Sequence, residues 1–159
     1  MNVIAVALRI FLDTGVLLDG CISAWSASKA VLILATHLPQ ITIVLADAVH
    51  QEAQRALARK AAISATADVE AAYAGWLARV RLERWPRPTE QEIARLAPAI
   101  LPVLRHVNDL PVVVSAVAAQ PDYVLSTNVA HWGPALAVRT NLRIQTPHQF
   151  LEALVADRP

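Results

Sequence analysis

Four oxygen-bearing side chains stand at points along the sequence where a fold could bring them together. They are Asp13, Glu52, Asp109 and Asn128. Considered singly, each has a simple structural explanation as a helix cap, a solvated surface residue or a turn residue. If the fold gathers them, their oxygens would suit Mg²⁺ or Mn²⁺, which prefer carboxylates and water as ligands. Whether they meet depends on the elements that carry them.

Carboxylates that crowd together repel one another, so one of them takes up a proton near neutral pH unless a cation is bound. A bound cation removes this repulsion, orients a water molecule and lowers the pKa of that water. It also neutralises negative charge on a phosphate group under attack. A gathered set of this kind would therefore suit the hydrolysis of phosphodiester bonds.

Short apolar runs separated by helical segments predict an α/β fold. The expected strands are residues 9–12, 41–45, 122–126 and 142–145. The expected helices are residues 26–36, 47–60, 65–80 and 108–119, with two more that begin at Thr89 and Thr146 and a loop at 81–88. Thr89 and Glu92 form a capping box, and Pro98 and Pro102 are expected to interrupt the helix that follows. This alternation favours a three-layer α/β/α sandwich around a mostly parallel sheet of four or five strands.

Asp13 and the turn at 126–128 each come directly after a predicted strand. In open parallel sheets, binding sites form beyond the carboxyl ends of the strands. The sheet is therefore expected to place Asp13 near Ser126 and Asn128, and the candidate chemistry at that edge.

Four short motifs occur in an order that resembles one nuclease family. They are Ile10-Phe-Leu-Asp13-Thr-Gly-Val-Leu-Leu18, Val49-His-Gln-Glu52, His106-Val-Asn-Asp109-Leu-Pro-Val112 and Tyr123-Val-Leu-Ser126-Thr-Asn128. Their spacing and predicted secondary structure are similar to those of the PIN-domain nucleases, including the VapC-like toxins of bacterial toxin–antitoxin pairs. The resemblance runs from about Arg9 to Leu154. It includes Gln145-Thr-Pro-His-Gln-Phe-Leu151, which looks like the family's closing strand and helix.

The resemblance implies a metal-dependent endoribonuclease with a PIN-like fold. It implies that Asp13 and Asp109 are the principal ligands of Mg²⁺ or Mn²⁺, and that Glu52 is a further ligand or orients the attacking water. Asn128 is expected at the remaining catalytic position. The residues expected to contact the substrate there are Ser126 and Thr14. RNA and an antitoxin protein are the partners that the resemblance implies.

Two positions depart from the family's pattern. Asn128 stands where the family more often has Asp, and a shifted alignment would place Val129 there, which cannot bind a metal. Gly15 stands where the family often has Asn, so an amide that could steady the site is missing. We therefore expect weaker metal affinity, one ion rather than two, or slow turnover. The alternative is a catalytically impaired PIN-like module that binds RNA or a partner protein.

The net charge of +1 excludes a strongly basic nucleic-acid coat, yet the arginines are unevenly distributed. Four of them lie in one short stretch, at Arg79, Arg81, Arg84 and Arg87. Together with Trp76 and Trp85, they could bind an RNA backbone and stack on bases. The alternative is a solvated helix face with two tryptophans in the core or in a dimer interface. His106 and His131 adjoin candidate site segments, where a phosphate contact and a neutral structural role are both open.

The length of 159 residues is typical of a single domain, so residues 1–159 are expected to form one. Hydrophobic residues make up 55% of the chain, an excess that suggests a homodimer face or a docking groove. Cys21 is the only cysteine, which excludes an internal disulfide and a cysteine-based zinc site, and it is expected to be buried. Neither a basic secretory leader nor an apolar run of membrane-spanning length is visible, so the expected location is the cytoplasm.

A second enzyme class shares the first motif. Phe11-Leu-Asp13-Thr-Gly-Val-Leu is faintly similar to the haloacid dehalogenase-like phosphatases, in which the Asp at the strand end is the nucleophile. That mechanism needs a second Asp two residues further on, where this chain has Gly15. Without it the leaving group has no general acid, so this class is disfavoured.

Overall fold

Five parallel strands form a sheet at the centre of the structure, a computed structural model that describes residues 6–63 and 68–156. The strand order is β3-β2-β1-β4-β5. The strands are β1 (Leu8–Leu12), β2 (Ile41–Ala46), β3 (Leu82–Trp85), β4 (Tyr123–Leu125) and β5 (Ile144–Gln145). The helices are α1 (Thr14–Ile22), α2 (Ala27–His37), α3 (Asp47–Ile63), α4 (Asp68–Arg79), α5 (Glu90–Ile100), α6 (Leu110–Ala119), α7 (Pro134–Thr140) and α8 (Pro147–Ala156). Two 3₁₀ helices, η1 (Leu101–Val103) and η2 (Val107–Asp109), precede α6.

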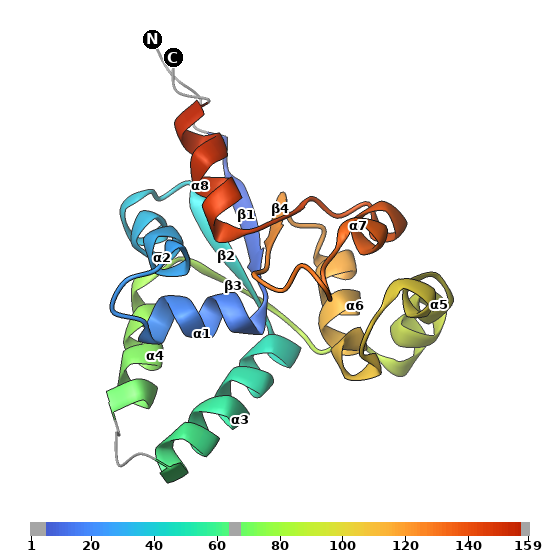
Figure 1. The fold of residues 1–159 in the computed structure, drawn as a ribbon, viewed down its shortest axis with the longest axis horizontal. Helices are drawn as coiled ribbons and strands as arrows, with labels where there is room; N and C mark the ends of the chain where they lie inside the picture. The colour runs from blue at the N-terminus through green and yellow to red at the C-terminus, as the bar shows by residue number, and fades with distance from the viewer. Residues whose placement is uncertain (1–5, 64–67, 157–159) are drawn as a thin grey trace.

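The central strands are apolar on both faces because helices cover the sheet on both sides. Ile10 and Phe11 in β1, and Ile43 and Val44 in β2, are at most 1% exposed. Figure 1 shows α1, α2 and α4 on one side of the sheet and α5, α6 and α7 on the other. The three-layer α/β/α fold with a parallel sheet that the sequence predicts is thus confirmed.

The predicted loop at 81–88 is partly wrong, because the segment contains a strand. β3 pairs in parallel with β2 along Leu82–Trp85. It is the edge strand of the sheet, where charged residues such as Glu83 and Arg84 are common and an alternating apolar pattern is weak. Trp85 packs against the core. The proline-rich sequence therefore makes a loop only after the strand has ended.

The helices also differ from the prediction in two respects. α1 and the short α7 are additional, and they begin at Thr14 and Pro134. α5 continues through Pro98, so the predicted interruption there is wrong, whereas Pro102 lies beyond its end. Proline removes the N–H that would bond to the Ala94 carbonyl, but Ala94 is exposed and water can take that place.

The remaining predicted elements are present, with ends that differ by a few residues. Residue 65, the predicted start of one helix, lies outside the described residues, and α4 is described from Asp68. Cys21 is buried as predicted, and burial raises the pKa of its thiol to about 12. Within the described residues, no single helix is long and apolar enough to cross a membrane. α1 and α2 reach that length and apolarity only as a pair, which is bent by 80°.

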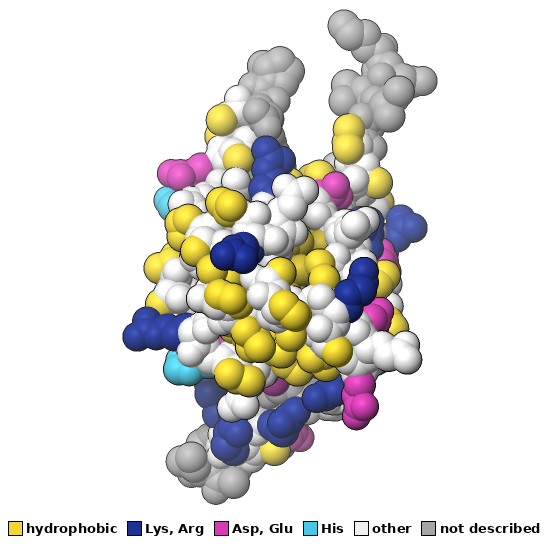
Figure 2. Space-filling view, turned by 90° about the vertical axis from the view of Figure 1, so that its right-hand side faces the viewer, with side chains coloured by type: hydrophobic (Ala, Val, Ile, Leu, Met, Phe, Trp, Pro, Cys, Tyr) yellow, Lys and Arg dark blue, Asp and Glu magenta, His cyan; other side chains and the backbone are white. Residues whose placement is uncertain are grey.

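Apolar side chains gather on one face of the molecule. Figure 2 shows this face, which lies over α5 and α7, with hydrophobic groups near its centre and basic groups mainly toward its edges. Val138 in α7 is 83% exposed, and Leu101 after α5 is 41% exposed. Part of the apolar excess in the composition is therefore on the surface.

Candidate active site

Asp13 lies at the carboxyl end of β1 and caps the helix that follows. Its Oδ1 accepts a hydrogen bond of 2.7 Å from the Thr14 N–H, which satisfies one of the free N–H groups at the start of α1. The Asp13 N–H donates to the Leu125 carbonyl at 3.0 Å, because β1 and β4 are neighbours. The Ser126 hydroxyl donates to Asp13 Oδ2 at 2.9 Å, so both carboxylate oxygens are held.

The turn after β4 lies beside Asp13, where the strand ends are expected to place it. Ser126 is 2% exposed, and its Oγ accepts a hydrogen bond of 3.0 Å from the Asn128 N–H. The Asn128 side chain is exposed, and Val129, the other residue considered for this position, is 68% exposed. Asp13 is thus joined directly to Ser126, and to Asn128 through the Ser126 hydroxyl.

Glu52 reaches the same region from α3. The Thr14 hydroxyl donates a hydrogen bond of 2.6 Å to Glu52 Oε2. α3 starts directly after β2, the strand beside β1, so its first turns lie close to the start of α1. Thr14 therefore links two predicted metal ligands, Asp13 through its backbone and Glu52 through its side chain.

Asp109 lies at the end of η2, directly before α6. Its Oδ2 is buried and lies 3.1 Å from His131 Nδ1, a contact that is an ion pair when the histidine is protonated but lacks the geometry of a hydrogen bond. The edge of the His106 ring meets the His131 ring, with centroids 4.4 Å apart. Both histidines therefore stand beside a predicted metal ligand, with His131 in contact with it.

Burial raises the pKa of the Asp13 carboxyl above its usual value, and the negative charges of Glu52 and Asp109 raise it further. The hydrogen bonds from Ser126 and Thr14 act in the opposite direction without offsetting the increase. Asp13 and Glu52 both bond to Thr14, which places these two carboxylates in one region. Asp109 comes from a third segment, and its negative charge also acts on Asp13.

The oxygens at this place are of the kind that a hard cation binds. Asp109 Oδ2 accepts no hydrogen bond, and the raised pKa of Asp13 marks a carboxylate whose charge is poorly compensated. Among the described residues, however, no three His, Cys, Asp or Glu side chains converge closely enough to hold a metal ion together. The donor types therefore fit Mg²⁺ or Mn²⁺, and a complete coordination shell would need oxygens from water or substrate, as is common for Mg²⁺.

No protein-family model matches the sequence, and no curated protein matches it. The fold is similar to that of VapBC2 from Rickettsia felis, solved bound to a DNA fragment from their promoter. The TM-score is 0.63, with 16% identity over 87% of this chain and 98% of the other. PAE2754 from Pyrobaculum aerophilum is also similar, with a TM-score of 0.60 and 15% identity over 96% of this chain and 99% of the other. The chain has a VapC-like PIN-domain fold.

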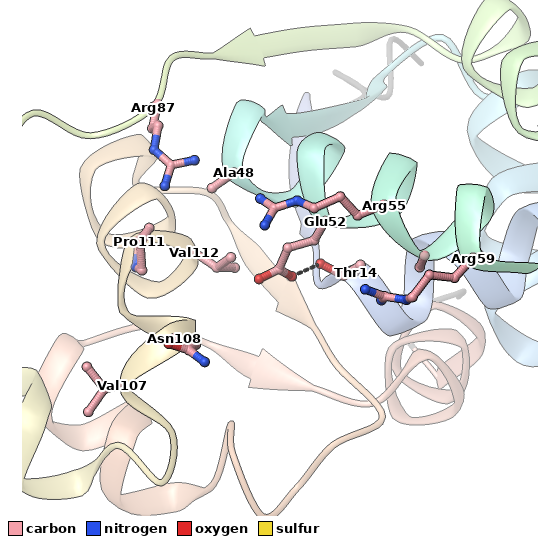
Figure 3. Close-up of a pocket in the computed structure, with 11 residues that line it drawn as sticks. Thr14, Ala48, Glu52, Arg55, Arg59, Arg87, Val107, Asn108, Pro111 and Val112 are labelled. Carbon is pink, nitrogen blue, oxygen red and sulfur yellow. Dashed lines mark hydrogen bonds between the residues drawn. The ribbon is translucent and has the colours of Figure 1, made fainter.

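In this PIN fold, a pocket of about 640 Å³ lies beside the acids (Figure 3). Thr14 and Glu52 line it from α1 and α3, and Asn108 lines it from η2. Asp13 and Asp109 do not line the pocket. Their neighbours in sequence, Thr14 and Asn108, do line it. The basic residues that line it are Arg55, Arg59 and Arg87.

Sequence reasoning misses Arg55 and Arg59 of the PIN fold. They follow Glu52 by three and seven positions on α3, a spacing that places side chains on one face of a helix. The sequence predicts the arginines at 79–87 instead, because a cluster can be recognised from the sequence alone. To select Arg55 and Arg59, one must know which face of α3 points toward the site. The helical spacing from Glu52 is the signal that could have found them.

The other arginines predicted to bind RNA contact the protein itself in this PIN fold. Arg84 pairs with Asp47 at 2.7 Å, and Arg81 donates a hydrogen bond of 3.5 Å to a backbone carbonyl. The Arg79 guanidinium lies over the Trp76 ring, 5.5 Å from its centroid, and that ring packs against the core. These three arginines do not line the pocket, and their contact with RNA stays a prediction.

Proposed function

We propose that this chain is a divalent-metal-dependent endoribonuclease that hydrolyses RNA phosphodiester bonds with Mg²⁺ or Mn²⁺. The observation that carries the proposal is the placement of Asp13, a half-buried carboxylate at the end of a central strand, which Ser126 contacts on one oxygen and Thr14, itself bonded to Glu52, on the other. The negative charges of Glu52 and Asp109 act on Asp13 as well. A cation would remove this repulsion. The VapC-like PIN-domain fold and the motifs that resemble PIN nucleases support the same activity.

We assign a separate task to each residue of the candidate site. When bound, Mg²⁺ or Mn²⁺ supplies a water of lowered pKa and neutralises charge on the phosphate. Asp13 and Asp109 would hold the cation. Glu52, held by its hydrogen bond to α1, would orient the attacking water. Ser126 keeps Asp13 in place, and Asn128 forms hydrogen bonds at the rim.

Cleavage of labelled RNA tests this function. The purified protein is expected to cut RNA with Mn²⁺ or Mg²⁺ and to lose activity when EDTA removes the cation. Asp13→Asn is expected to abolish cleavage while the fold remains, because Asn can still cap α1 but carries no charge. Full cleavage by this variant would refute the role of Asp13, and cleavage in EDTA would refute the need for a metal.

The remaining proposals concern the assembly and its surroundings. We propose that residues 1–159 form a single domain that acts in the cytoplasm as a homodimer with an antitoxin partner. The similarity to VapBC2, solved with DNA from their promoter, supports the antitoxin, and the apolar face over α5 and α7 supports a protein partner. Contacts with RNA beyond the pocket are assigned to Arg79, Arg81 and Arg84.

A second candidate function is a catalytically impaired PIN-like module that binds RNA or a partner protein. Asn128 favours it, because its amide supplies no negative charge at the rim of the site. The lack of three converging metal ligands among the described residues favours it as well. A crystal soaked in Mn²⁺ separates the two functions. A peak between Asp13 and Asp109 supports the nuclease, and an empty site supports the impaired module.

A further inference from the structure

The exposed side of α3 carries two arginines next to the proposed catalytic Glu52. Arg55 and Arg59 line the same pocket as Glu52, and Arg87 reaches it from the segment after β3 (Figure 3). Ala56 also lines the pocket, and its small side chain leaves the helix surface open between the longer ones. The pocket wall therefore combines one carboxylate with three guanidinium groups, an excess of positive charge.

These arginines form no ion pair with any residue that the structure describes. Within the described residues, the ion pairs of arginine involve Arg9 and Arg84 and none of the three at the pocket. Arg55 donates to the Gln51 backbone carbonyl at 3.3 Å, and Arg87 donates to the Gln51 side-chain oxygen at 2.5 Å. Both acceptors are neutral. The guanidinium groups at the pocket are therefore available to an anionic ligand.

The spacing of the two α3 arginines fits a chain of phosphates. Residues four positions apart on a helix are separated by about 6 Å along its axis, close to the spacing of neighbouring phosphates on one nucleic acid strand. A guanidinium group can bind a phosphate through two parallel hydrogen bonds. An acidic protein segment would also be attracted here, because Glu52 repels carboxylates and phosphates alike. The regular spacing of phosphates and the proposed ribonuclease function are what favour RNA.

We propose that Arg55 and Arg59 bind successive backbone phosphates of a single-stranded RNA and place the next phosphodiester beside Glu52. The inference deepens the proposed ribonuclease function and rests on it for the identity of the ligand. Because contacts to phosphates carry no base information, this wall gives affinity and register but no sequence preference. Strands of unrelated sequence are therefore expected to depend on it equally.

Binding of a labelled single-stranded RNA to the full chain, followed by fluorescence anisotropy at several salt concentrations, tests the proposal. Every protein in the series carries Asp13→Asn, so that the RNA stays intact. The variant is Arg55→Gln with Arg59→Gln. The matched control is Arg139→Gln, which removes an exposed arginine of α7 that does not line the pocket.

The double variant is expected to bind about tenfold more weakly at low salt. The slope of log affinity against log salt is expected to become shallower by about 0.7 for each arginine removed. Arg55→Lys with Arg59→Lys keeps the charge, so the slope is expected to be retained while the loss of paired hydrogen bonds weakens binding. The control is expected to match the parent.

Equal RNA binding by the double variant and the control would overturn the proposal, as would a parent that binds no RNA. If the double variant lost its binding to a polyglutamate probe but kept its binding to RNA, the proposal would be overturned in favour of an acidic protein ligand. The nuclease function fails by a different result, namely no metal-dependent cleavage by the chain with Asp13 intact. Arginine-dependent RNA binding in that case would leave this inference standing and support the impaired module.

Discussion

At the scale of single residues, Asp13 affects both the stability of the fold and the proposed chemistry. Its pKa is raised chiefly by burial, so the folded chain binds a proton at this position more tightly than the unfolded chain does. Ionisation of Asp13 therefore opposes folding. The resulting loss of stability is absent below the ordinary pKa of the group and increases as the pH rises toward the raised value. At higher pH the full penalty remains unless a cation binds.

We therefore predict that Asp13→Asn raises the melting temperature at neutral pH when divalent cations are absent. Asn can accept the same hydrogen bond from the Thr14 N–H, but it removes the buried charge. Each 1 kcal/mol added to the free energy of unfolding would raise the melting temperature by about 2–4 °C for a chain of this size. Thermal unfolding between pH 3 and 8 measures the effect, which should vanish at the acidic end. A less stable variant at pH 7 would contradict the electrostatic explanation.

Binding of Mn²⁺ or Mg²⁺ should offset the destabilising effect of the ionised Asp13 carboxylate. Added cation is expected to raise the melting temperature of the unmodified chain, because it relieves the repulsion among Asp13, Glu52 and Asp109 and binds only the folded form. The Asp13→Asn variant is expected to show little or no shift in the same titration. Equal shifts for both proteins would place the cation elsewhere.

Asn128→Asp tests the departure from the family's pattern. The backbone N–H of residue 128 donates to Ser126, which itself contacts Asp13, so a carboxylate on this residue is expected to add negative charge near the proposed site. Cleavage is expected to be equal or faster, with tighter Mn²⁺ affinity. The same substitution combined with Asp13→Asn is the control and should stay inactive. A large loss of activity from Asn128→Asp alone would mean that this turn does not face the metal.

Residues that directly follow a strand are the ones whose neighbours can be predicted from sequence. Asp13 and Ser126 meet because parallel strands end at the same edge of the sheet. The contact of Asp109 with His131 depends on the irregular path of residues 126–133, which no periodic pattern encodes. The direction of the α3 arginines depends on the rotation of the helix about its axis, which tertiary packing decides.

At the scale of elements, the apolar strands in the middle of the sheet can be predicted from the sequence. The charged strand at the edge of the sheet is harder to predict. β2 is apolar except at Thr42, because both of its faces are covered. β3 has the sequence Leu-Glu-Arg-Trp, which a surface loop would also tolerate. Its strand conformation comes from pairing with β2, a contact between segments that are far apart in the sequence. Tertiary structure thus decides this element.

The packing of α1 against α2 leads to a prediction about glycine. A Cβ at Gly20 would lie 2.8 Å from Leu32 Cδ1 and 3.0 Å from the Ser28 carbonyl oxygen. Gly20→Ala is therefore expected to destabilise the protein by about 1–3 kcal/mol through overpacking. Gly75→Ala in α4 is the matched control, because a Cβ there meets nothing within 4 Å.

The control substitution is expected to stabilise the helix by about 0.5–1 kcal/mol, since glycine loses more backbone entropy on folding than alanine. Urea unfolding of both variants and the unmodified chain measures the difference. Similar effects from the two substitutions would show that the approach of α1 and α2 is looser than described.

At the scale of the whole molecule, the proposed homodimer predicts a particle of twice the monomer mass in light scattering. Val138→Glu is expected to shift the protein toward the monomer, because Val138 is 83% exposed and belongs to α7, one of the two helices beneath the apolar face. Val155→Glu is the control, since Val155 is also exposed, at 69%, but belongs to α8. A monomer before substitution, or equal shifts from both variants, would exclude a dimer through this face.

The sheet has a further consequence that concerns the order in which the chain is made. Asp13 receives its hydrogen bond from Ser126, which lies 113 positions later. A ribosome therefore releases Asp13 long before it synthesises Ser126, and β4, which precedes Ser126, cannot take its place in the sheet until its own codons have been read. An enzyme assembled in this way would be inert toward the transcript that encodes it until the ribosome has passed the codon for Ser126.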